Sequence, residues 1–217
     1  MRRITSLIAC AGLAATAAVA STSMAAPTNS IVITAPAAAK AEIGKKAPAF
    51  KMKDLDGKEH SLADFKGKTV VLVGDLKHGR TVHSLAKMLA AFDVALVFVA
   101  PPELAMPAGV AAAVDAGTAT RAEAPSLAAA LVDADALYVT RVQKERFPDA
   151  AAYEAVRGSY VVDARLMKTA KPSCAVLHPL PRVDEISADF DSDPRAAYFR
   201  QMRNGLFARM ALLDLVL

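Results

Sequence analysis

From Thr69 to the end of the chain, short apolar runs alternate with stretches whose apolar residues recur at helical spacing. Short continuous apolar runs are typical of buried strands, and strands that alternate with helices form parallel sheets covered on both faces. The pattern therefore predicts a three-layer, Rossmann-like α/β domain over residues 69–217. Its expected strands are Val70–Val73, Val94–Val99, Ala136–Val139, Ala175–Leu177 and a weaker one near Thr118–Thr120.

Two helices have clear apolar faces. The helix expected after the first strand carries Val82, Leu85, Leu89 and Phe92 on one side. The chain ends in a longer helix whose apolar residues are spaced 3, 4, 4, 3 and 4 apart, which forms one continuous stripe along the helix. The stripe consists of Phe199, Met202, Leu206, Met210, Leu213 and Leu217.

The first 41 residues have the pattern of an export leader and a linker. Basic residues at the start, an apolar run over 4–20 and small residues at Ser23–Ala25 predict a secretory signal peptide cleaved after Ala25. The apolar run is short for a membrane span, so no membrane contact is expected once the signal is removed. Residues 26–41, rich in Ala, Pro, Ser and Thr, predict a flexible linker. The leader indicates an exported or periplasmic protein.

Residues 42–68 predict a small β-hairpin, with Asp56-Gly57 as its turn signal. Together with the strand that follows, to residue 73, this stretch resembles the lead-in of thioredoxin-like redoxins. Those proteins place a catalytic cysteine after that strand, and none follows it here. A structural add-on is therefore favoured over a redox function.

Composition and charge exclude several classes of function. Hydrophobic residues make up 54% and charged residues 22%, which fits a folded domain. Without Arg2 and Arg3 the 26 basic residues become 24 against 22 acidic ones, a net charge of +2, too weak to indicate a nucleic-acid partner. Cys174 lies in an apolar run and is expected to be structural. No His, Cys or Asp cluster has metal-ligand spacing, so neither a metal nor a cofactor is expected.

The segment from Gly74 to Thr81 follows the first strand and opens a helix. Ligands of open parallel sheets bind beyond the carboxyl ends of the strands, and a helix start favours anions. Arg80 is placed there, and its guanidinium fits a carboxylate or phosphate bidentately. The segment also comes close to the phosphate-binding P-loop, but that loop has Lys at the position of Arg80, and a P-loop is not favoured.

Two further segments follow strands in the same way. In Thr140–Arg146, Arg141 and Gln143 alternate, so in extended backbone they point the same way. The alternative for this segment is a charged, solvent-facing loop. In His178–Arg182, two prolines rigidify the loop and one of them is a candidate cis residue. The carbonyls of Pro179 and Leu180 would then be fixed acceptors. His178 could act as a base, but a lone His after a strand is more often structural.

Taken in order, these segments resemble the aspartate-binding domain of aspartate carbamoyltransferases, and the likeness extends over about residues 69–217. Shorter matches include Val183–Ile186 and Asn204–Arg209. The resemblance implies a transferase of pyrimidine biosynthesis, in which the amino group of L-aspartate attacks carbamoyl phosphate and releases phosphate. It also implies a cytoplasmic location, against the leader. Whether the chain is itself an enzyme is left open by the sequence.

The resemblance assigns roles to particular residues. Arg80, with Thr81, and Arg141 would hold the two carboxylates of aspartate, and Gln143 would position it. The carbonyls of Pro179 and Leu180 would contact the reacting groups. Residues 147–158 correspond to a loop that closes over the substrate. The residues implied to position loops are Lys77, Arg146, Arg182 and Arg209.

The family also has a preceding domain that binds carbamoyl phosphate, with a Ser-Thr-Arg-Thr-Arg motif that does not occur in these 217 residues. We therefore expect an aspartate-binding half that is inactive alone and uses carbamoyl phosphate only with a complementing domain. The alternatives are a non-catalytic exported module that binds a dicarboxylate or amino acid, and a truncated redoxin-like fusion. In the family the last helix packs on the preceding domain, so its stripe is expected to be exposed and to favour self-association.

Overall fold

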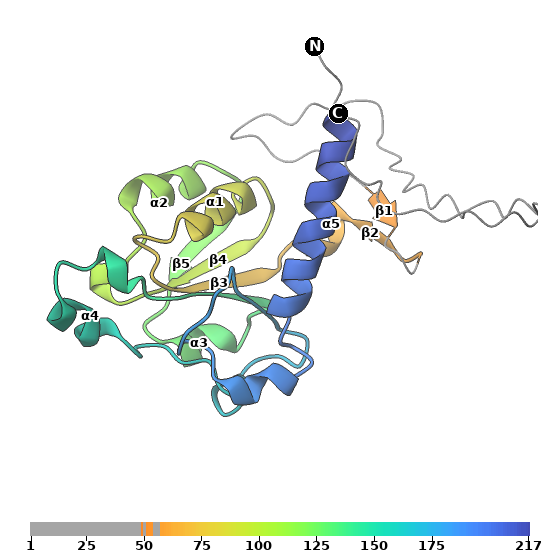
Figure 1. Ribbon diagram of the computed structural model, residues 1–217. Coiled ribbons are helices and arrows are strands. Elements are labelled where there is room, and N and C mark those ends of the chain that lie inside the picture. The colour runs from red at the N-terminus through yellow and green to blue at the C-terminus, as the bar shows by residue number, and fades with distance from the viewer. Residues whose placement is uncertain (1–48, 50, 54–56) are drawn as a thin grey trace, which may run out of the picture. The chain divides into compact units, whose positions relative to one another are not determined.

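The computed structural model describes residues 49, 51–53 and 57–217. Its centre is a five-stranded parallel sheet with the strand order β5-β4-β3-β6-β7 (Figure 1). The predicted α/β fold is confirmed, and the predicted leader and linker lie outside the described residues. The strands of the sheet are β3 (Thr69–Gly74), β4 (Ala95–Val99), β5 (Thr120–Glu123), β6 (Ala136–Thr140) and β7 (Ala175–Leu177).

Helices cover both faces of the sheet, with α1 and α2 on one face and α3 on the other (Figure 1). The helices are α1 (Arg80–Leu89), α2 (Ala108–Asp115), α3 (Leu127–Leu131), α4 (Ala150–Val156) and α5 (Tyr198–Val216). Among these described helices, none combines the length and apolarity that a membrane span requires. Short 3₁₀ turns occur at η1 (Leu62–Phe65), η2 (Pro102–Leu104), η3 (Lys144–Arg146), η4 (Leu166–Lys168) and η5 (Ala188–Ser192).

The two faces of the sheet belong to two separate apolar clusters. Val71 and Val73 of β3 pack in the cluster under α3, whereas Leu72 between them packs in the cluster under α1 and α2. All three side chains are fully buried. This is the period-2 alternation of a strand that is covered on both faces, which is why the run reads as continuously apolar in the sequence.

The order of the strands creates a switch point between β3 and β6. The chain builds β3, β4 and β5 outward in one direction, then returns to add β6 and β7 on the other side of β3. Val73 pairs with Val99 of β4 on one side and with Val139 of β6 on the other, always in parallel. In open α/β sheets the crevice for ligands lies at the carboxyl ends of the strands at such a point.

A two-stranded antiparallel sheet precedes this domain in the chain. It pairs β1 (Lys51–Lys53) with β2 (Glu59–Ser61), and Lys51 Nζ lies 3.0 Å from Glu59 Oε1. An antiparallel pair around Gly57, whose φ is +80°, agrees with the turn signal at that position.

Two details of the sequence prediction were wrong. The weak strand near Thr118–Thr120 instead runs from Thr120 to Glu123, because the backbone N–H of Thr118 donates to the Ala90 carbonyl rather than to a strand. Phe92, assigned to the apolar face of the first helix, lies beyond its end at Leu89. It still packs against the same core, so the apolar spacing was read correctly and only the helix end was misplaced.

Gly74 closes the switch point and tolerates no side chain. Its φ is +111°, and a Cβ built on it would lie 2.1 Å from the carbonyl oxygen of Thr140 on the neighbouring strand. We expect Gly74→Ala to lower the free energy of unfolding by at least ~2 kcal/mol, because both the strained φ and the backbone clash oppose folding. Urea denaturation measures the change.

Gly109 provides the matched control for this substitution. It lies in α2, and a Cβ built there meets no atom within 4 Å. Gly109→Ala should leave stability unchanged or raise it by up to about 1 kcal/mol, because Ala favours the helix. Equal effects at the two positions would contradict the close approach of β3 to β6.

Candidate functional site

Three loops meet at the carboxyl edge of the sheet because the strands that precede them are neighbours. The strands β3, β6 and β7 end at Gly74, Thr140 and Leu177, and the sheet places these strands side by side in the order β3-β6-β7, so the loops that follow them start next to one another. The first two loops flank the switch point. The structure therefore brings together the three segments singled out in the sequence.

Asp75 joins the first loop to the second from a fully buried position. Its Oδ1 accepts a hydrogen bond from the backbone N–H of His78 at 2.9 Å, and Oδ2 accepts one from the backbone N–H of Gln143 at 3.4 Å. The ring Nδ1 of His78 lies 3.1 Å from the same carboxylate. Thr140 adds a second link through its hydroxyl, which donates to the Val73 carbonyl at 3.1 Å.

Arg80 is the first residue of α1 and is exposed. Within the described part of the chain its guanidinium has no ion pair. Gly79, at the N-cap, supplies no side chain to the helix start, and a Cβ there would lie 2.7 Å from the Asp75 carbonyl. A free guanidinium beside an uncapped helix start is a favourable place for an anion.

Arg141 is held in a bidentate pair by Glu145 in the second loop. Arg141 Nη2 donates to Glu145 Oε1 at 2.5 Å and Nη1 to Oε2 at 3.3 Å. These hydrogen bonds raise the pKa of Arg141, and Glu185 of the third loop adds to the effect through its charge. Arg141 is thus oriented by one carboxylate and lies within the field of another. A bound carboxylate would share or take over the position of Glu145.

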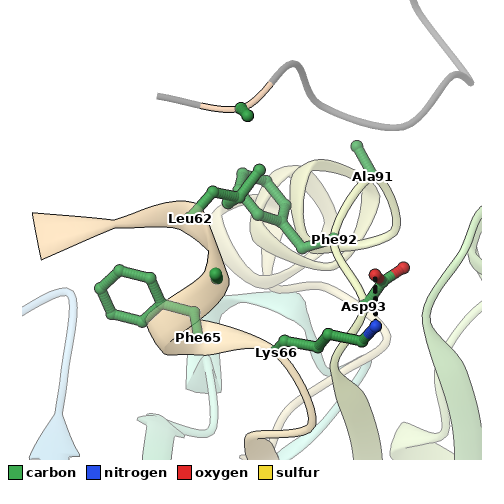
Figure 2. A pocket seen from close by; sticks show the side chains of 8 residues that line it. Leu62, Phe65, Lys66, Ala91, Phe92 and Asp93 are labelled. Atoms are coloured by element: carbon green, nitrogen blue, oxygen red, sulfur yellow. Dashed lines mark ion pairs between the residues drawn. The ribbon is translucent and has the colours of Figure 1, made fainter. Parts of the chain in front are cut away.

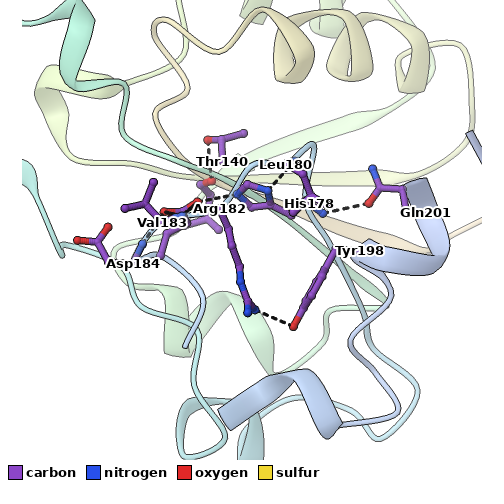
Figure 3. Close-up of polar contacts among 10 residues, drawn as sticks. Thr140, His178, Leu180, Arg182, Val183, Asp184, Tyr198 and Gln201 are labelled. Carbon is purple, nitrogen blue, oxygen red and sulfur yellow. Dashed lines mark hydrogen bonds and ion pairs between the residues drawn. The ribbon is translucent and has the colours of Figure 1, made fainter. Parts of the chain in front are cut away.

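His178 organises the third loop from the interior, where it is 1% exposed. Its Nδ1 accepts a hydrogen bond from the backbone N–H of Leu180 at 2.8 Å, so Nε2 carries the proton toward Glu185 Oε1, also at 2.8 Å (Figure 3). The side chain of Gln201 on α5 accepts from the His178 backbone N–H at 3.0 Å. With both ring nitrogens engaged, His178 shapes the loop.

The loop held in this way has an unusual backbone. Leu180 has a φ of +54°, and the Leu180–Pro181 peptide bond is cis, which confirms that one of the two prolines is cis. Glu185 also accepts hydrogen bonds from the backbone N–H groups of Val183 and Asp184, at 3.2 Å each. Burial acts to raise the pKa of Glu185, but the hydrogen bonds from His178 and the backbone outweigh it and lower the pKa.

Arg182 fastens the end of the third loop to η5 and α5. Its guanidinium forms a bidentate pair with Asp191. It also donates to the Tyr198 hydroxyl at 3.2 Å (Figure 3). It also lies over the ring of Tyr198, 5.4 Å from the centroid. Arg182 therefore positions the loop. Arg209, placed in the same group by the sequence, lies instead on α5 and donates to the Gly205 carbonyl of its own helix.

The segment expected to close over a substrate packs against the first loop. Phe147 lies edge-on to His78, with ring centroids 6.1 Å apart, and edge-on to Tyr153 of α4 at 5.8 Å. Lys144 Nζ lies 5.7 Å from the centroid of Tyr153. Lys77 and Arg146 are exposed on the two loops that face this segment.

An apolar pocket elsewhere in the chain does not belong to this site. It lies between η1 and the end of α1, and Lys66 and Asp93 form an ion pair of 4.0 Å at its margin (Figure 2). These two residues precede β3 and β4, so the pocket is at the amino edge of the sheet, opposite the three loops. Among the described residues no group of His, Cys, Asp and Glu side chains could hold a metal ion.

Comparison with known proteins identifies the family to which this fold belongs. The Asp/Orn-binding domain of aspartate/ornithine carbamoyltransferases matches residues 66–216. The chain belongs to the aspartate/ornithine carbamoyltransferase family. It is 46% identical over 170 residues to the aspartate carbamoyltransferase catalytic subunit of Chromobacterium violaceum, covering 78% of this chain and 56% of the relative. The multifunctional protein CAD of Squalus acanthias is also 46% identical over 170 residues, 78% of this chain and 8% of that protein.

Solved structures of the family superpose on the same region. The catalytic subunit of M. jannaschii aspartate transcarbamoylase matches with a TM-score of 0.63 and 45% identity, over 69% of this chain and 48% of that one. The Trypanosoma cruzi enzyme in complex with carbamoyl phosphate and aspartate matches with a TM-score of 0.64 and 44% identity, over 70% and 51%. The chain thus spans about half the length of these subunits. The hairpin precedes the family match, and its likeness to redoxins stays a prediction.

Sequence reasoning found the basic and loop residues of the site but gave no role to its carboxylates. Asp75 and Glu145 lie within the segments that were singled out, and Glu185 lies in a shorter match. Their roles depend on contacts between loops, at separations of 68 residues for Asp75 and Gln143, which no local pattern reveals. The only sequence signal was an acidic residue next to a strand end or beside an Arg.

Replacing Glu185 by Gln tests the buried network of the third loop. Gln turns an NH₂ group toward N–H donors and removes a charged acceptor, so we expect a loss of about 1–3 kcal/mol in unfolding free energy at pH 7. Because the folded-state pKa of Glu185 lies below its ordinary 4.5, the ionised carboxylate stabilises the fold above that pH and ceases to do so as the pH falls below it.

The difference in unfolding free energy between Glu185→Gln and the natural chain should therefore become smaller as the pH is lowered below 4.5. Urea denaturation at several pH values measures this difference. Glu103→Gln, which removes an exposed carboxylate on η2, is the control and should change the free energy of unfolding at pH 7 by no more than about 0.5 kcal/mol. If the difference in unfolding free energy between Glu185→Gln and the natural chain stayed constant with pH, the charge of Glu185 would not stabilise the loop.

Proposed function

We propose that the three loops bind L-aspartate as one half of a carbamoyl-transfer site. The observation that carries the proposal is the Arg80 guanidinium, which has no ion pair among the described residues and lies at an uncapped helix start. The loop that leads to it follows β3, which pairs with β6, and the loop after β6 carries Arg141. Two guanidinium groups on adjacent loops suit a small molecule with two carboxylates. Relatives of this chain include an aspartate carbamoyltransferase catalytic subunit, and one solved relative holds aspartate and carbamoyl phosphate.

In the proposed site the guanidinium groups of Arg80 and Arg141 bind the two carboxylates of aspartate. Thr81, the second residue of α1, and Gln143 complete the binding surface on the first two loops. The carbonyls of Pro179 and Leu180 accept hydrogen bonds from the amine and the carbamoyl group. Since Leu180 is fixed by the buried His178, these acceptors are set before the substrate arrives.

The chemistry further requires a phosphate-binding surface opposite the three loops. Carbamoyl transfer to an amine forms a C–N bond and expels phosphate, and its barrier is lowered by positioning and by cations that neutralise the phosphate. The Ser-Thr-Arg-Thr-Arg motif that binds the phosphate in the family is not in the 217 residues. We propose that a complementing carbamoyl-phosphate domain supplies that surface.

Substitution of the two arginines tests aspartate binding. We expect Arg80→Ala and Arg141→Ala each to weaken binding of L-aspartate by roughly tenfold to a hundredfold, because each removes a charge-assisted hydrogen-bond pair. Calorimetric titration with aspartate and with succinate, in the presence and absence of carbamoyl phosphate, makes the measurement.

Arg165→Ala is the matched control, since Arg165 is exposed at the start of η4 and outside the three loops. Its binding should equal that of the natural chain. Unchanged affinity in both site variants would remove the basis for an aspartate site. Succinate binding as tight as aspartate binding would assign the two arginines to dicarboxylates in general.

Turnover distinguishes a transferase half from a binding module. The 217-residue chain alone should form negligible carbamoyl-aspartate, and adding the carbamoyl-phosphate domain of a family member in trans should raise the rate. Radiolabelled carbamoyl phosphate detects the product. Formation of carbamoyl-aspartate by the chain alone would contradict the proposed requirement for a second domain. Tight aspartate binding with no turnover under either condition would instead favour the exported binding module.

A further inference from the structure

The outer edge of β7 is paired with the segment that leads into α5. The backbone N–H of Val176 donates to the Arg195 carbonyl at 2.8 Å, and the N–H of Ala197 donates to the Val176 carbonyl at 2.9 Å. This is the hydrogen-bond pattern of two parallel strands, in which one residue bonds to two residues of its neighbour. Because every second residue of a strand faces the same neighbour, the next donor on this edge is the N–H of His178.

Gln201 provides the acceptor for that donor with its side chain. In a continued ladder the His178 N–H would donate to the Ala197 carbonyl. That carbonyl instead accepts the backbone N–H of Gln201 at 2.7 Å, where the chain turns into α5. The side-chain Oε1 of Gln201 accepts the His178 N–H at 3.0 Å (Figure 3). The Gln201 amide therefore takes the place of a backbone carbonyl and extends the ladder beyond the end of β7.

This hydrogen bond fixes the part of the third loop that presents the Pro179 and Leu180 carbonyls. The stretch from His178 to Pro181 contains only two backbone N–H groups, those of His178 and Leu180, because its two prolines have none. The ring of His178 accepts the N–H of Leu180, so the partner from outside the loop is Gln201. Leu180 has a φ of +54°, which residues with a side chain rarely adopt, so the loop depends on contacts that hold it there.

The first turn of α5 orients Gln201 toward the loop. Tyr198 and Gln201 are three residues apart and therefore lie on the same face of the helix. Tyr198 is fully buried and accepts a hydrogen bond from Arg182, which turns this face toward the third loop. The apolar stripe on the remainder of the helix is exposed, as the sequence predicts. Met202, Leu206, Met210 and Leu213 are each 56–57% exposed.

We propose that Gln201 is a positioning residue that sets the preference of the site for an amino dicarboxylate over a plain dicarboxylate. The inference rests on the proposed aspartate site, in which two arginines bind the carboxylates and the carbonyls of Pro179 and Leu180 accept hydrogen bonds from the amine. Gln201 acts on the amine through the backbone of His178, which it holds. Succinate has the same two carboxylates and no amine, so its binding does not depend on Gln201.

Titration of the 217-residue chain with L-aspartate and with succinate tests the proposal. Gln201→Met keeps the length of the side chain and removes the acceptor, so L-aspartate should bind roughly tenfold more weakly. The affinity for succinate should stay within about twofold of that of the natural chain, because Arg80 and Arg141 keep their places. The ratio of the two affinities, measured by calorimetry, reports the preference.

Two further variants separate the acceptor from other effects of the substitution. Gln201→Glu keeps an acceptor at the same reach and should retain at least the natural preference for L-aspartate. Its negative charge favours the ligand that carries an amino group, so a loss of preference in this variant would not come from charge. Asn204→Met, at an exposed position on the next turn of α5, is the matched control and should leave both affinities unchanged.

Amide hydrogen exchange followed by NMR tests the hydrogen bond without any ligand. In Gln201→Met the backbone amide of His178 should exchange roughly tenfold faster than in the natural chain, because its acceptor is gone. The amide of Val176, which donates to the Arg195 carbonyl on the same edge, should keep its rate. Equal acceleration at both amides would show a general loosening of this edge and would contradict a specific role for Gln201.

The titrations distinguish failure of this inference from failure of the proposed aspartate site. Equal weakening of L-aspartate and succinate in Gln201→Met would show that Gln201 only stabilises the domain. A preference that Gln201→Met keeps, or that Gln201→Glu loses, would show that the hydrogen bond to His178 does not set it. Each of these results overturns the inference and leaves the aspartate site intact. A natural chain that binds neither ligand would overturn both proposals.

Discussion

The approach of Gly74 to Thr140 is the constraint on which the remainder of the site depends. It lets β3 and β6 end side by side at the switch point of the sheet, and any Cβ at residue 74 would enter the carbonyl of residue 140. Asp75, the next residue, is then close enough to the second loop to accept the N–H of Gln143. One backbone contact thus fixes the relation between the two loops that carry Arg80 and Arg141.

Buried carboxylates do the positioning, and the exposed guanidinium of Arg80 is left for a ligand. Asp75 and Glu185 are nearly inaccessible and accept backbone N–H groups from the loops that they shape. A buried charge is tolerated only where hydrogen bonds replace its hydration, and both carboxylates meet that condition. Arg80, by contrast, is exposed and unpaired among the described residues. The contrast separates the residues that build the site from those that would bind.

The sequence predicted the sheet well because its strands are buried on both faces and therefore read as uninterrupted apolar runs. It misplaced β5, the edge strand, whose residues are mostly exposed and whose start is set by the hydrogen bonds of Thr118 to Ala90. The site was predicted as far as its residues follow strand ends, as Arg80 and Arg141 do. The roles of Asp75 and Glu185 were not, because they arise from contacts between loops that only the folded chain brings together.

Helix α5 links the third loop to the exposed stripe through its first turn. Tyr198 is buried and receives a hydrogen bond from Arg182, and Gln201 accepts one from the His178 backbone, so the helix start is fixed by the same loop that presents Pro179 and Leu180. Whatever packs on the stripe therefore acts on a helix whose start is part of the site. Anything that covers the stripe would restrain that start, whereas the proposed carbamoyl transfer also needs cations that bind the phosphate. Covering the stripe and completing the proposed carbamoyl-transfer site are thus separate requirements.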